Sequence, residues 1–581
     1  MDQLFQMFAR YLLPAVAVLT LAATPAMPAD GVRTPLGEKL DAHMSRLEAY
    51  GFSGSLLVAR GGEVILHKGY GFADAQRKVP FTSDTAFDVG SITKQFTATA
   101  ILKLEMQGKL SVTDPISKWF EGVPEDKKGI TLHHLLTHSA GLEDIFGDDY
   151  EEMPRNRLVK TALESKLLWA PGTRYRYSNA GYSLLATVVE LASGKPYEVY
   201  LQESLWKPTG MTRTGYRLQE KGPLAHGVVG DREDWGTPLD KAWAPDGPWW
   251  NLRGNGGVLS TTGDLYKWHQ ALEGEKILSK EAKAKMFTPH VPEDEEGRSH
   301  YGYGWAIMKT ARGTRLVSHN GGNGIFNADF RRYTDDGVVL IIGSNRQDFR
   351  SIPAVGPITR LIFNADYSAP PAVVKVEPSA SIRHAGNYAL PSGGKIRVTV
   401  VESSSGWPGV TLTPEGKDAF QILAGGAAAA DTAEGEKRLL AGLEQSRKGD
   451  YALLAEVFGA PVAEVAGQSK ETWSRLEGIH GAFQSLDLLG TTSTAGRPTT
   501  WVEARFERGK SLMQFGWDGS TVATIQVLDR PPGGVLYLPE SGTSFASYDP
   551  RTGAVTRIGF EEGAMVLRNA AGEVRAKKEA G

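Results

Sequence analysis

Ser91 and Lys94 are the residues of this chain whose types and spacing point most directly to chemistry. A serine hydroxyl becomes a nucleophile at neutral pH only when a base or a positive charge lies close to it. Residues three apart in a helix share one face, so the Lys94 amine is able to reach back over the Ser91 hydroxyl. The pair indicates nucleophilic catalysis, although the same spacing is also common on solvated helix faces.

Two further segments carry side chains that an acyl-transfer site needs. Tyr177 and Asn179 stand just before a helical pattern. A phenol has a pKa of about 10 in water, and a nearby ammonium lowers that pKa, so Tyr177 is a candidate base. Asn179 is a candidate to orient Lys94 or to bind a substrate amide. The run His319-Asn320-Gly321-Gly322 ends a strand pattern, where glycines let the backbone approach a ligand.

In this order the three segments resemble the serine β-lactamase and penicillin-binding-protein superfamily, on the class C branch with its esterases and D-amino-acid peptidases. That superfamily carries S-x-x-K, then Y-x-N, then a Lys- or His-headed motif that ends in Gly. The likeness covers residues 40 to 350. Four further stretches contribute to it: Ile130–Leu142, Pro171–Thr173, Gly256–Thr261 and Tyr301–Trp305.

The resemblance implies that Ser91 is the acylated nucleophile, and that Lys94 and Tyr177 share the proton transfers. Which of the two is the immediate base is left open by the sequence. Our hypothesis favours an ionised Tyr177 beside a charged Lys94, because a phenolate could serve both acylation and the later activation of water.

The resemblance also assigns the substrate side of the site. Asn179 organises it, and His319 faces the substrate across the cleft. Asn320, Gly321 and Gly322 contribute to substrate binding, and the Gly322 N–H joins the Ser91 N–H in an oxyanion hole.

Position 319 bears on the substrate, because class C β-lactamases carry Lys where this chain has His. An imidazole near pH 7 is mostly neutral and offers no fixed charge to a carboxylate. This favours esters, amides or D-amino-acid peptides as substrates. The alternatives are a β-lactamase, a D-Ala-D-Ala carboxypeptidase or, in another class, a catalytically silent protein that binds peptidoglycan or a partner.

Hydrophobic periodicity places strands at both ends of this region and helices between them. Residues 54–59 and 63–68 are apolar runs joined by a Gly-containing turn, which predicts a hairpin. Residues 91–107 and 182–192 have helical spacing. Three later segments are predicted strands: 314–319, 325–333 and 338–343. We predict an α/β sandwich of the β-lactamase/transpeptidase type, with an antiparallel sheet beside a helical domain.

The chain has 581 residues, which is too long for one ordinary core. A proline-containing linker is predicted at 366–380, between a hydrolase domain at 30–365 and an accessory region at 381–581. The accessory region has a mostly helical pattern at 434–476 and a strand meander at 501–528. It shows no catalytic constellation, so we predict a small α+β or β-barrel-like accessory module.

The N-terminus predicts export. Arg10 precedes an apolar run from Tyr11 to Ala23, and small residues follow up to Ala29. The run is shorter than the about 20 apolar residues that span a bilayer, so residues 1–29 are interpreted as a cleaved signal peptide, with an uncleaved anchor as the alternative. The absence of cysteine excludes a lipidated cysteine. We predict a periplasmic or secreted bacterial protein without stable membrane insertion after cleavage.

Composition and charge limit the partners. A net charge of −3 gives no electrostatic reason to expect nucleic acid, so the predicted partner is a small-molecule or peptide substrate. His133, His134 and His138 suggest a metal site, but the H-E-x-x-H pattern is missing, and we predict neither metal nor cofactor. The tryptophans at 235–250 either line the acyl pocket or form a local packing cluster.

Overall fold

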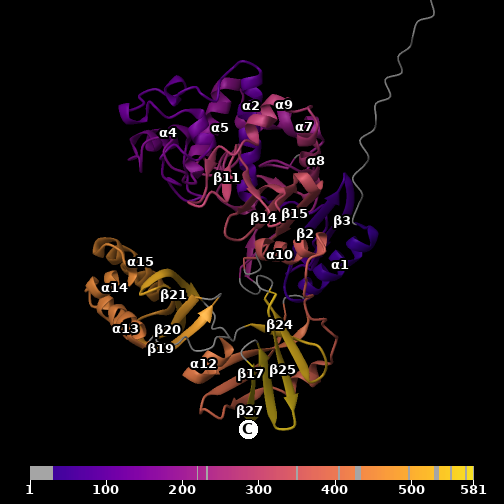
Figure 1. Ribbon diagram of the computed structural model, residues 1–581, viewed down its shortest axis with the longest axis vertical. Helices are drawn as coiled ribbons and strands as arrows, with labels where there is room; N and C mark the ends of the chain where they lie inside the picture. Colours follow the sequence, from indigo (N-terminus) through magenta and orange to yellow (C-terminus); the bar gives the residue numbers. More distant parts are fainter. Residues whose placement is uncertain are drawn as a thin grey trace, which may run out of the picture.

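A computed structural model of the chain describes residues 31–579, apart from residues 219, 230–232, 348–350, 404–405, 425–432, 495–496, 529–534, 550–552 and 570–571. The predicted signal peptide, residues 1–29, lies outside the described residues. Figure 1 shows a large region of helices and sheet from the N-terminal half, and two smaller modules from the C-terminal part. Within the described ranges, every helix is too short or too polar to cross a membrane.

An antiparallel sheet forms the centre of the N-terminal region. The predicted hairpin of β2 and β3 pairs with the late strand β15, so the two ends of this region meet in one sheet. Across the sheet the described strands are β1 (Gly31–Val32), β3 (Glu63–Tyr70), β2 (Gly54–Arg60), β15 (Val338–Ser344), β14 (Asn327–Tyr333), β13 (Arg315–Gly322), β12 (Ala306–Lys309), β11 (Ser299–Tyr301) and β10 (Val291–Pro292).

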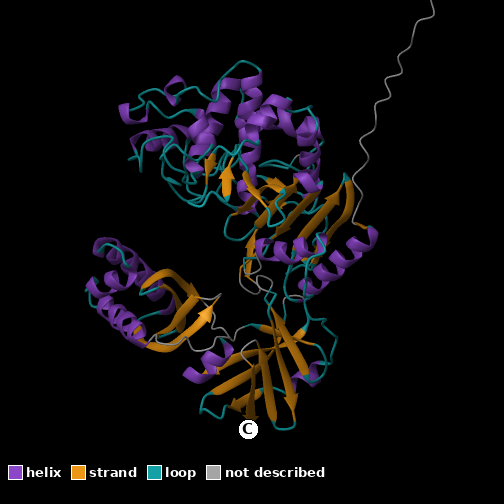
Figure 2. Ribbon diagram, viewed as in Figure 1, coloured by secondary structure: helices purple, strands orange, loops and turns teal. Residues whose placement is uncertain are grey.

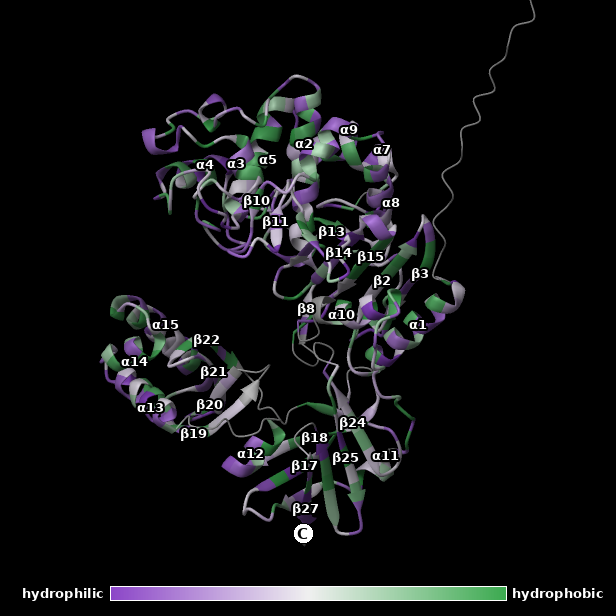
Figure 3. Ribbon diagram, viewed as in Figure 1, coloured by the Kyte–Doolittle hydropathy of each residue, from purple (hydrophilic) through white to green (hydrophobic). Residues whose placement is uncertain are grey.

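The sheet has two apolar faces because side chains alternate along each strand. On β2, Leu57 packs into one hydrophobic cluster and Leu56 into another. Helices α1 (Thr34–Ala49) and α10 (Ser351–Ile362) cover the Leu56 face, and a larger helical region covers the Leu57 face. Figure 2 shows the sheet between these helical layers, and in Figure 3 hydrophobic residues are concentrated in its strands. The predicted α/β sandwich is confirmed.

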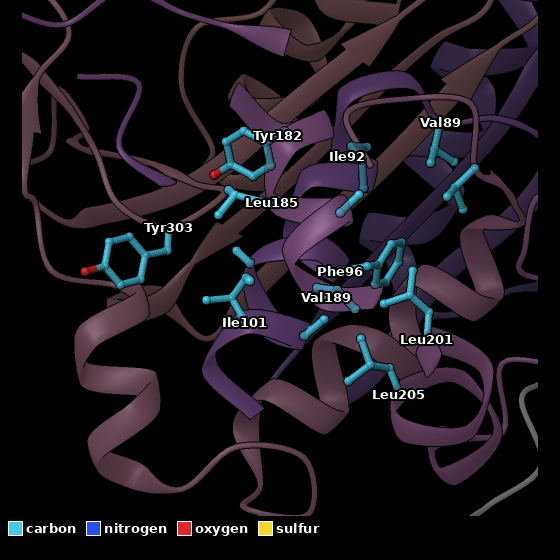
Figure 4. Close-up of a cluster of buried hydrophobic side chains, with 14 of the residues drawn as sticks. Val89, Ile92, Phe96, Ile101, Tyr182, Leu185, Val189, Leu201, Leu205 and Tyr303 are labelled. Atoms are coloured by element: carbon cyan, nitrogen blue, oxygen red, sulfur yellow. The ribbon is translucent and has the colours of Figure 1, made fainter. Parts of the chain in front are cut away.

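The larger helical region contributes most of the buried core beside Ser91. Figure 4 shows Val89 and Ile92, which flank Ser91, in one cluster with Phe96 and Val189. Fully burying a large apolar side chain contributes about 1.5–3 kcal/mol, so these neighbours fix the position of Ser91. The helices of this region are α2 (Thr93–Met106), α3 (Leu132–Leu136), α4 (Arg155–Glu164), α5 (Asn179–Ser193), α6 (Tyr197–Leu201), α7 (Lys207–Thr209), α8 (Thr262–Glu273) and α9 (Lys280–Met286).

The C-terminal part contains a closed antiparallel barrel. Tyr548 of the barrel packs into the cluster under α1, and its ring centroid lies 6.1 Å from that of Tyr50. The barrel is therefore in contact with the N-terminal region. Its described strands, in order around the barrel, are β16 (Gly386–Ala389), β17 (Lys395–Glu402), β18 (Pro408–Glu415), β23 (Leu536–Pro539), β24 (Ser544–Tyr548), β25 (Val555–Glu561), β26 (Ala564–Asn569) and β27 (Gly572–Lys578).

A second accessory module is inserted into the barrel between β18 and β23. These two strands pair with each other, so the barrel closes across the insertion. The accessory region therefore contains both architectures that the sequence left open, one nested in the other. The described elements of the insertion are α12 (Lys417–Leu423), α13 (Ala433–Arg447), α14 (Ala452–Phe458), α15 (Val462–His480), β19 (Phe483–Thr494), β20 (Arg497–Phe506), β21 (Gly509–Asp518) and β22 (Thr521–Leu528).

Gly343 on β15 provides a test of how the sheet positions the turn that contains Ser91. A Cβ at this residue would lie 2.2 Å from the ring of Phe87, which is four residues before Ser91 in the chain. We expect Gly343→Ala to displace Phe87 and to lower the free energy of unfolding by about 1–3 kcal/mol. The measurement is denaturant unfolding at equilibrium.

The matched control for this test is Gly467→Ala on helix α15, where an added Cβ meets no atom within 4 Å. Alanine is the better helix former, so this variant should be neutral or slightly more stable. Equal free energies of unfolding for the two variants would contradict the argument.

Candidate active site

Ser91 lies at a sharp turn between strand β6 (Phe87–Asp88) and helix α2. β6 pairs with β9 (Leu259–Ser260), which fixes the chain before the turn. Gly90 has a φ of +52°, and a Cβ there would lie 2.2 Å from the Gly322 nitrogen, so only glycine fits. The α-helix was predicted from residue 91, but it begins at Thr93, after a 3₁₀ turn that contains Ser91.

The Lys94 amine joins the three predicted elements of the site. Its Nζ donates hydrogen bonds to Ser91 Oγ at 3.0 Å, to Asn179 Oδ1 at 2.6 Å and to the Asn255 carbonyl at 2.8 Å. The serine and lysine that stand three apart in the sequence are thus in direct contact. Asn255 lies in a loop and gave no signal in the sequence.

The protonation of Lys94 is controlled by its burial. The residue is 0% exposed, and desolvation lowers its pKa to about 7, against the opposing influence of the Asp144 and Asp149 carboxylates. A lysine with this pKa is neutral in a large fraction of molecules near pH 7, and its lone pair is then available to accept a proton. In the neutral form the two N–H groups serve Asn179 and Asn255, and the lone pair faces the Ser91 O–H, so the geometry and the pKa both suit Lys94 to receive the Ser91 proton.

Asn179 is held by a carboxylate that the sequence did not reveal. The Asn179 backbone N–H and its side-chain Nδ2 both donate to Asp144 Oδ1, at 3.0 and 2.9 Å. This leaves the amide oxygen to accept from Lys94. Ser178 caps helix α5 by accepting a hydrogen bond from the Gly181 N–H. Asp144 lies in an irregular loop, and only its contact with α5 identifies it.

Tyr177 is hydrogen-bonded to Ser91, yet its electrostatic environment differs from the predicted one. Burial raises the pKa of the phenol, and the hydrogen bond to Ser91 only partly opposes this. Lys94 Nζ lies 4.7 Å from the ring centroid, over the face of the ring. Burial therefore opposes the ionised Tyr177 of the sequence-based hypothesis in the free protein, while a pKa of about 7 leaves Lys94 charged in part of the molecules near pH 7.

His319 is a neutral residue in the wall of the cleft, as the sequence predicted. Burial lowers its pKa to about 3, and Lys94 acts in the same direction. Its Nδ1 lies 2.6 Å from the Asn320 carbonyl, so we place the proton there, and its Nε2 accepts from the Tyr301 hydroxyl at 2.8 Å. Together with Tyr177 and Tyr301 it lines a cavity of about 290 Å³. It therefore faces the cleft with its ring, while both ring nitrogens are bonded within the protein.

The glycines after His319 bring two distant backbone segments into contact. A Cβ at Gly321 would lie 2.0 Å from the Val89 carbonyl oxygen and 2.7 Å from the Ser91 nitrogen. With the Gly90–Gly322 contact, this packs the end of β13 directly on the nucleophile turn. The backbone nitrogens of Ser91 and Gly322 therefore lie close to each other, as an oxyanion hole formed by both would require.

Asp88 links the nucleophile turn to the loop after β13, and sequence reasoning missed it. Its carboxylate accepts from the Gly90 N–H at 2.7 Å and from Asn323 Nδ2 at 2.9 Å. The Asn323 side-chain oxygen in turn accepts two backbone N–H groups of its own loop. Burial raises the pKa of Asp88 to about 7, although the Gly90 N–H opposes this.

Each histidine that suggested a metal site has a hydrogen-bond partner within the protein: the Tyr303 hydroxyl for His133, the Thr131 N–H for His134 and the Ser178 N–H for His138. His138 Nδ1 accepts from the Ser178 N–H at 3.0 Å, and its ring centroid lies 4.3 Å from that of Tyr177. Within the described ranges, no group of three or more His, Asp or Glu side chains is arranged to hold a metal. Of the tryptophans, Trp235 packs against Phe326 and Tyr150, with ring centroids 5.9 Å apart in both cases.

Comparisons with known proteins agree with this geometry. The Beta-lactamase family model matches residues 40–358, which is more than half of the chain. The chain belongs to the Beta-lactamase family. It is thus a serine hydrolase related to the β-lactamases and penicillin-binding proteins, and the resemblance seen in the sequence is confirmed.

Individual proteins similar to this chain align with different shares of it. Penicillin-binding protein 4* of Bacillus subtilis (strain 168) is 30% identical over 379 residues, which are 61% of this chain and 82% of the relative. Protein flp of Staphylococcus aureus (strain MRSA252) is 31% identical over 222 residues, 37% of this chain and 44% of the relative. The octameric penicillin-binding protein homologue from Pyrococcus abyssi has a TM-score of 0.52 at 19% identity, over 93% of this chain and 100% of its own, which shows a shared fold.

Asp88→Asn tests the buried carboxyl of this family member. The pKa of Asp88, about 7, lies above that of an exposed aspartate, so the folded state holds the proton more tightly than the unfolded state. This contribution to stability is present at low pH and is lost as the pH rises from about 4 to about 7. The Asn variant cannot ionise, so we expect its unfolding temperature relative to wild type to increase from about pH 4 to about pH 7 and to level off above that range.

The control is Asp366→Asn, which changes an exposed aspartate. Its difference from wild type should stay constant over the same pH range. A constant difference for Asp88→Asn as well would show that Asp88 does not titrate as its burial indicates.

Proposed function

We propose that the protein is an exported serine hydrolase that forms an acyl-enzyme on esters, amides or D-amino-acid peptides. The observation that carries this proposal is the buried contact of Lys94 Nζ with Ser91 Oγ, Asn179 Oδ1 and the Asn255 carbonyl. A buried amine with a lowered pKa next to a hydroxyl is the arrangement that activates a serine nucleophile.

Acylation follows from these positions. Ser91 Oγ attacks the substrate carbonyl carbon, and its proton passes to the neutral amine of Lys94. The N–H groups of Ser91 and Gly322 bind the oxyanion, where losing one such donor typically costs about 10²–10³ in kcat. Tyr177, hydrogen-bonded to Ser91, transfers a proton toward the leaving group, which departs as the alcohol or amine. Lys94 then passes its extra proton to Tyr177. A water adds to the acyl carbon and gives a proton to Lys94, the bond between Ser91 Oγ and the acyl carbon breaks, and Ser91 Oγ takes this proton as the acid leaves.

The nature of position 319 supports the choice of substrates. A neutral His319 supplies no fixed positive charge for the carboxylate of a β-lactam or of a peptide that ends in D-Ala-D-Ala. The name of the Bacillus subtilis relative, a penicillin-binding protein, favours the second candidate, a β-lactamase or D-Ala-D-Ala carboxypeptidase. A silent binding protein would have no need for the hydrogen bonds that hold Lys94 on Ser91.

The proposed location is the periplasm or the medium of a bacterium. The support is the apolar run from Tyr11 to Ala23, which follows Arg10 and is followed by small residues up to Ala29. Expression in a bacterial host, followed by N-terminal sequencing of the periplasmic or secreted protein, tests cleavage after Ala26 or Ala29. Retention of the full chain in the cytoplasm would contradict export.

Covalent labelling tests the acyl-enzyme. We expect a fluorophosphonate or a labelled penicillin to give an adduct on Ser91 that mass spectrometry locates. Ser91→Ala should abolish labelling, while Ser165→Ala, at the distant end of helix α4, should not. An intact folded protein that never becomes labelled would support the silent binding protein instead.

The pH dependence of hydrolysis tests which group is the base. Because the pKa of Lys94 is about 7 and the neutral amine is the reactive form, kcat/KM for a neutral p-nitrophenyl ester should rise with pH through a midpoint near 7. Lys94→Met should lower kcat/KM by about 10²–10⁴. Tyr177→Phe should lower it while leaving the midpoint unchanged. Loss of that midpoint in Tyr177→Phe would assign the base to the phenol.

A further inference from the structure

The cavity lined by Tyr177 and His319 has its own recognition groups. β12 pairs with β13 only as far as Ala306 and Ser318, so residues 319–322 of β13 run past the end of β12. The cavity of about 290 Å³ lies at this sheet edge and is lined by Tyr177, Tyr301 and His319 and by the acid Glu293. Two tyrosines, a histidine and an acid thus line one space, and one of the tyrosines, Tyr177, is hydrogen-bonded to Ser91.

Glu293 carries a charge that no cation neutralises among the residues described. Its carboxylate accepts from the Tyr175 hydroxyl at 3.0 Å and from the Ser299 hydroxyl, both of which are neutral donors. Its charge also reaches the site, because it raises the pKa values of Tyr177 and Tyr301.

The other ionisable groups in the cavity wall do not add positive charge. Arg331 donates through Nε and Nη2 to the two carboxylate oxygens of Asp329, at 3.0 and 3.1 Å, and the Asp329 side chain is only 2% exposed. This pair is therefore neutral as a unit. His319 is neutral as well. Glu293 is therefore the acid of this wall that has no cationic partner among the described residues.

We infer that this cavity binds a positively charged amine or quaternary ammonium group of the substrate, and that Glu293 is the specificity-determining residue. A carboxylate forms an ion pair with such a cation, and neither Arg331, which is paired with Asp329, nor the neutral His319 offsets its charge. The inference rests on the proposed function and narrows its substrates to ammonium-bearing esters, amides or D-amino-acid derivatives. Substrates with a carboxylate at this position are disfavoured, since Arg331 is already paired.

Matched substrate pairs test this inference. One pair places the charge on the acyl side: D-alanine p-nitroanilide against its N-acetyl and N-succinyl derivatives. The other places it on the leaving group: butyrylcholine against 3,3-dimethylbutyl butyrate, its neutral isostere. We expect the cationic member of at least one pair to have a kcat/KM about tenfold or more above the neutral member, mainly through KM.

Glu293→Gln then assigns the effect to one residue. Glutamine keeps an oxygen for the Tyr175 hydroxyl, so the variant should fold and remain reactive toward a fluorophosphonate. Loss of the charge also changes the pKa of Tyr177, which affects both members of a pair alike, so the quantity compared is the ratio of kcat/KM within each pair. The preference for the cationic member should disappear. The control is Glu295→Gln, an exposed acid of the same loop, which should keep the preference. Equal rates within both wild-type pairs, or a preference for the succinyl derivative, would overturn the inference.

A binding measurement decides the question even without turnover. Calorimetric titration of Ser91→Ala with benzyltrimethylammonium should show binding that weakens about tenfold or more when Glu293→Gln is added. Binding unaffected by Glu293→Gln, or no binding to either form, would refute the ammonium site. Failure of Ser91 to label in wild type would refute the proposed hydrolase mechanism separately.

Discussion

The burial of the Lys94 amine against Ser91 is the interaction on which the rest of this site depends. Removing an ammonium from water is unfavourable unless hydrogen bonds and opposite charges compensate for it. Here three oxygen acceptors hold the amine, while Asp144 and Asp149 act on it from a greater distance. The balance leaves the pKa near 7, so the same group is stable in the core and able to exchange a proton.

The backbone around the nucleophile depends on equally close contacts. Gly90 and Gly321 allow the turn at Ser91 and the end of β13 to approach within distances that no Cβ would permit. Asp88 and Asn323 then connect the same two segments through hydrogen bonds. The sheet and the helical region are needed to hold these segments in place, because neither one has enough local contacts to fix its own conformation.

Much of this arrangement could be predicted from the sequence. The spacing of Ser91 and Lys94, the following Tyr177 and Asn179, and the strand that ends at Gly322 correctly indicated which groups meet. The alternating and helical patterns predicted the sandwich. Asp88, Asp144 and Asn255 were missed because they lie in loops or at strand ends, where no periodicity marks them. The sequence did not resolve the barrel, because its closure depends on pairing between β18 and β23, which a whole inserted module separates in the chain.

The sequence by itself determined the reactive groups, their order and the strands and helices that carry them, because these follow from residue type and short-range spacing. The tertiary structure alone decided the protonation states. Tyr177 was expected to ionise on the basis of its neighbours in the site, yet burial raises its pKa and lowers that of Lys94. Proton affinity depends on solvent exclusion and on charges from distant segments, and these exist only once the chain has folded.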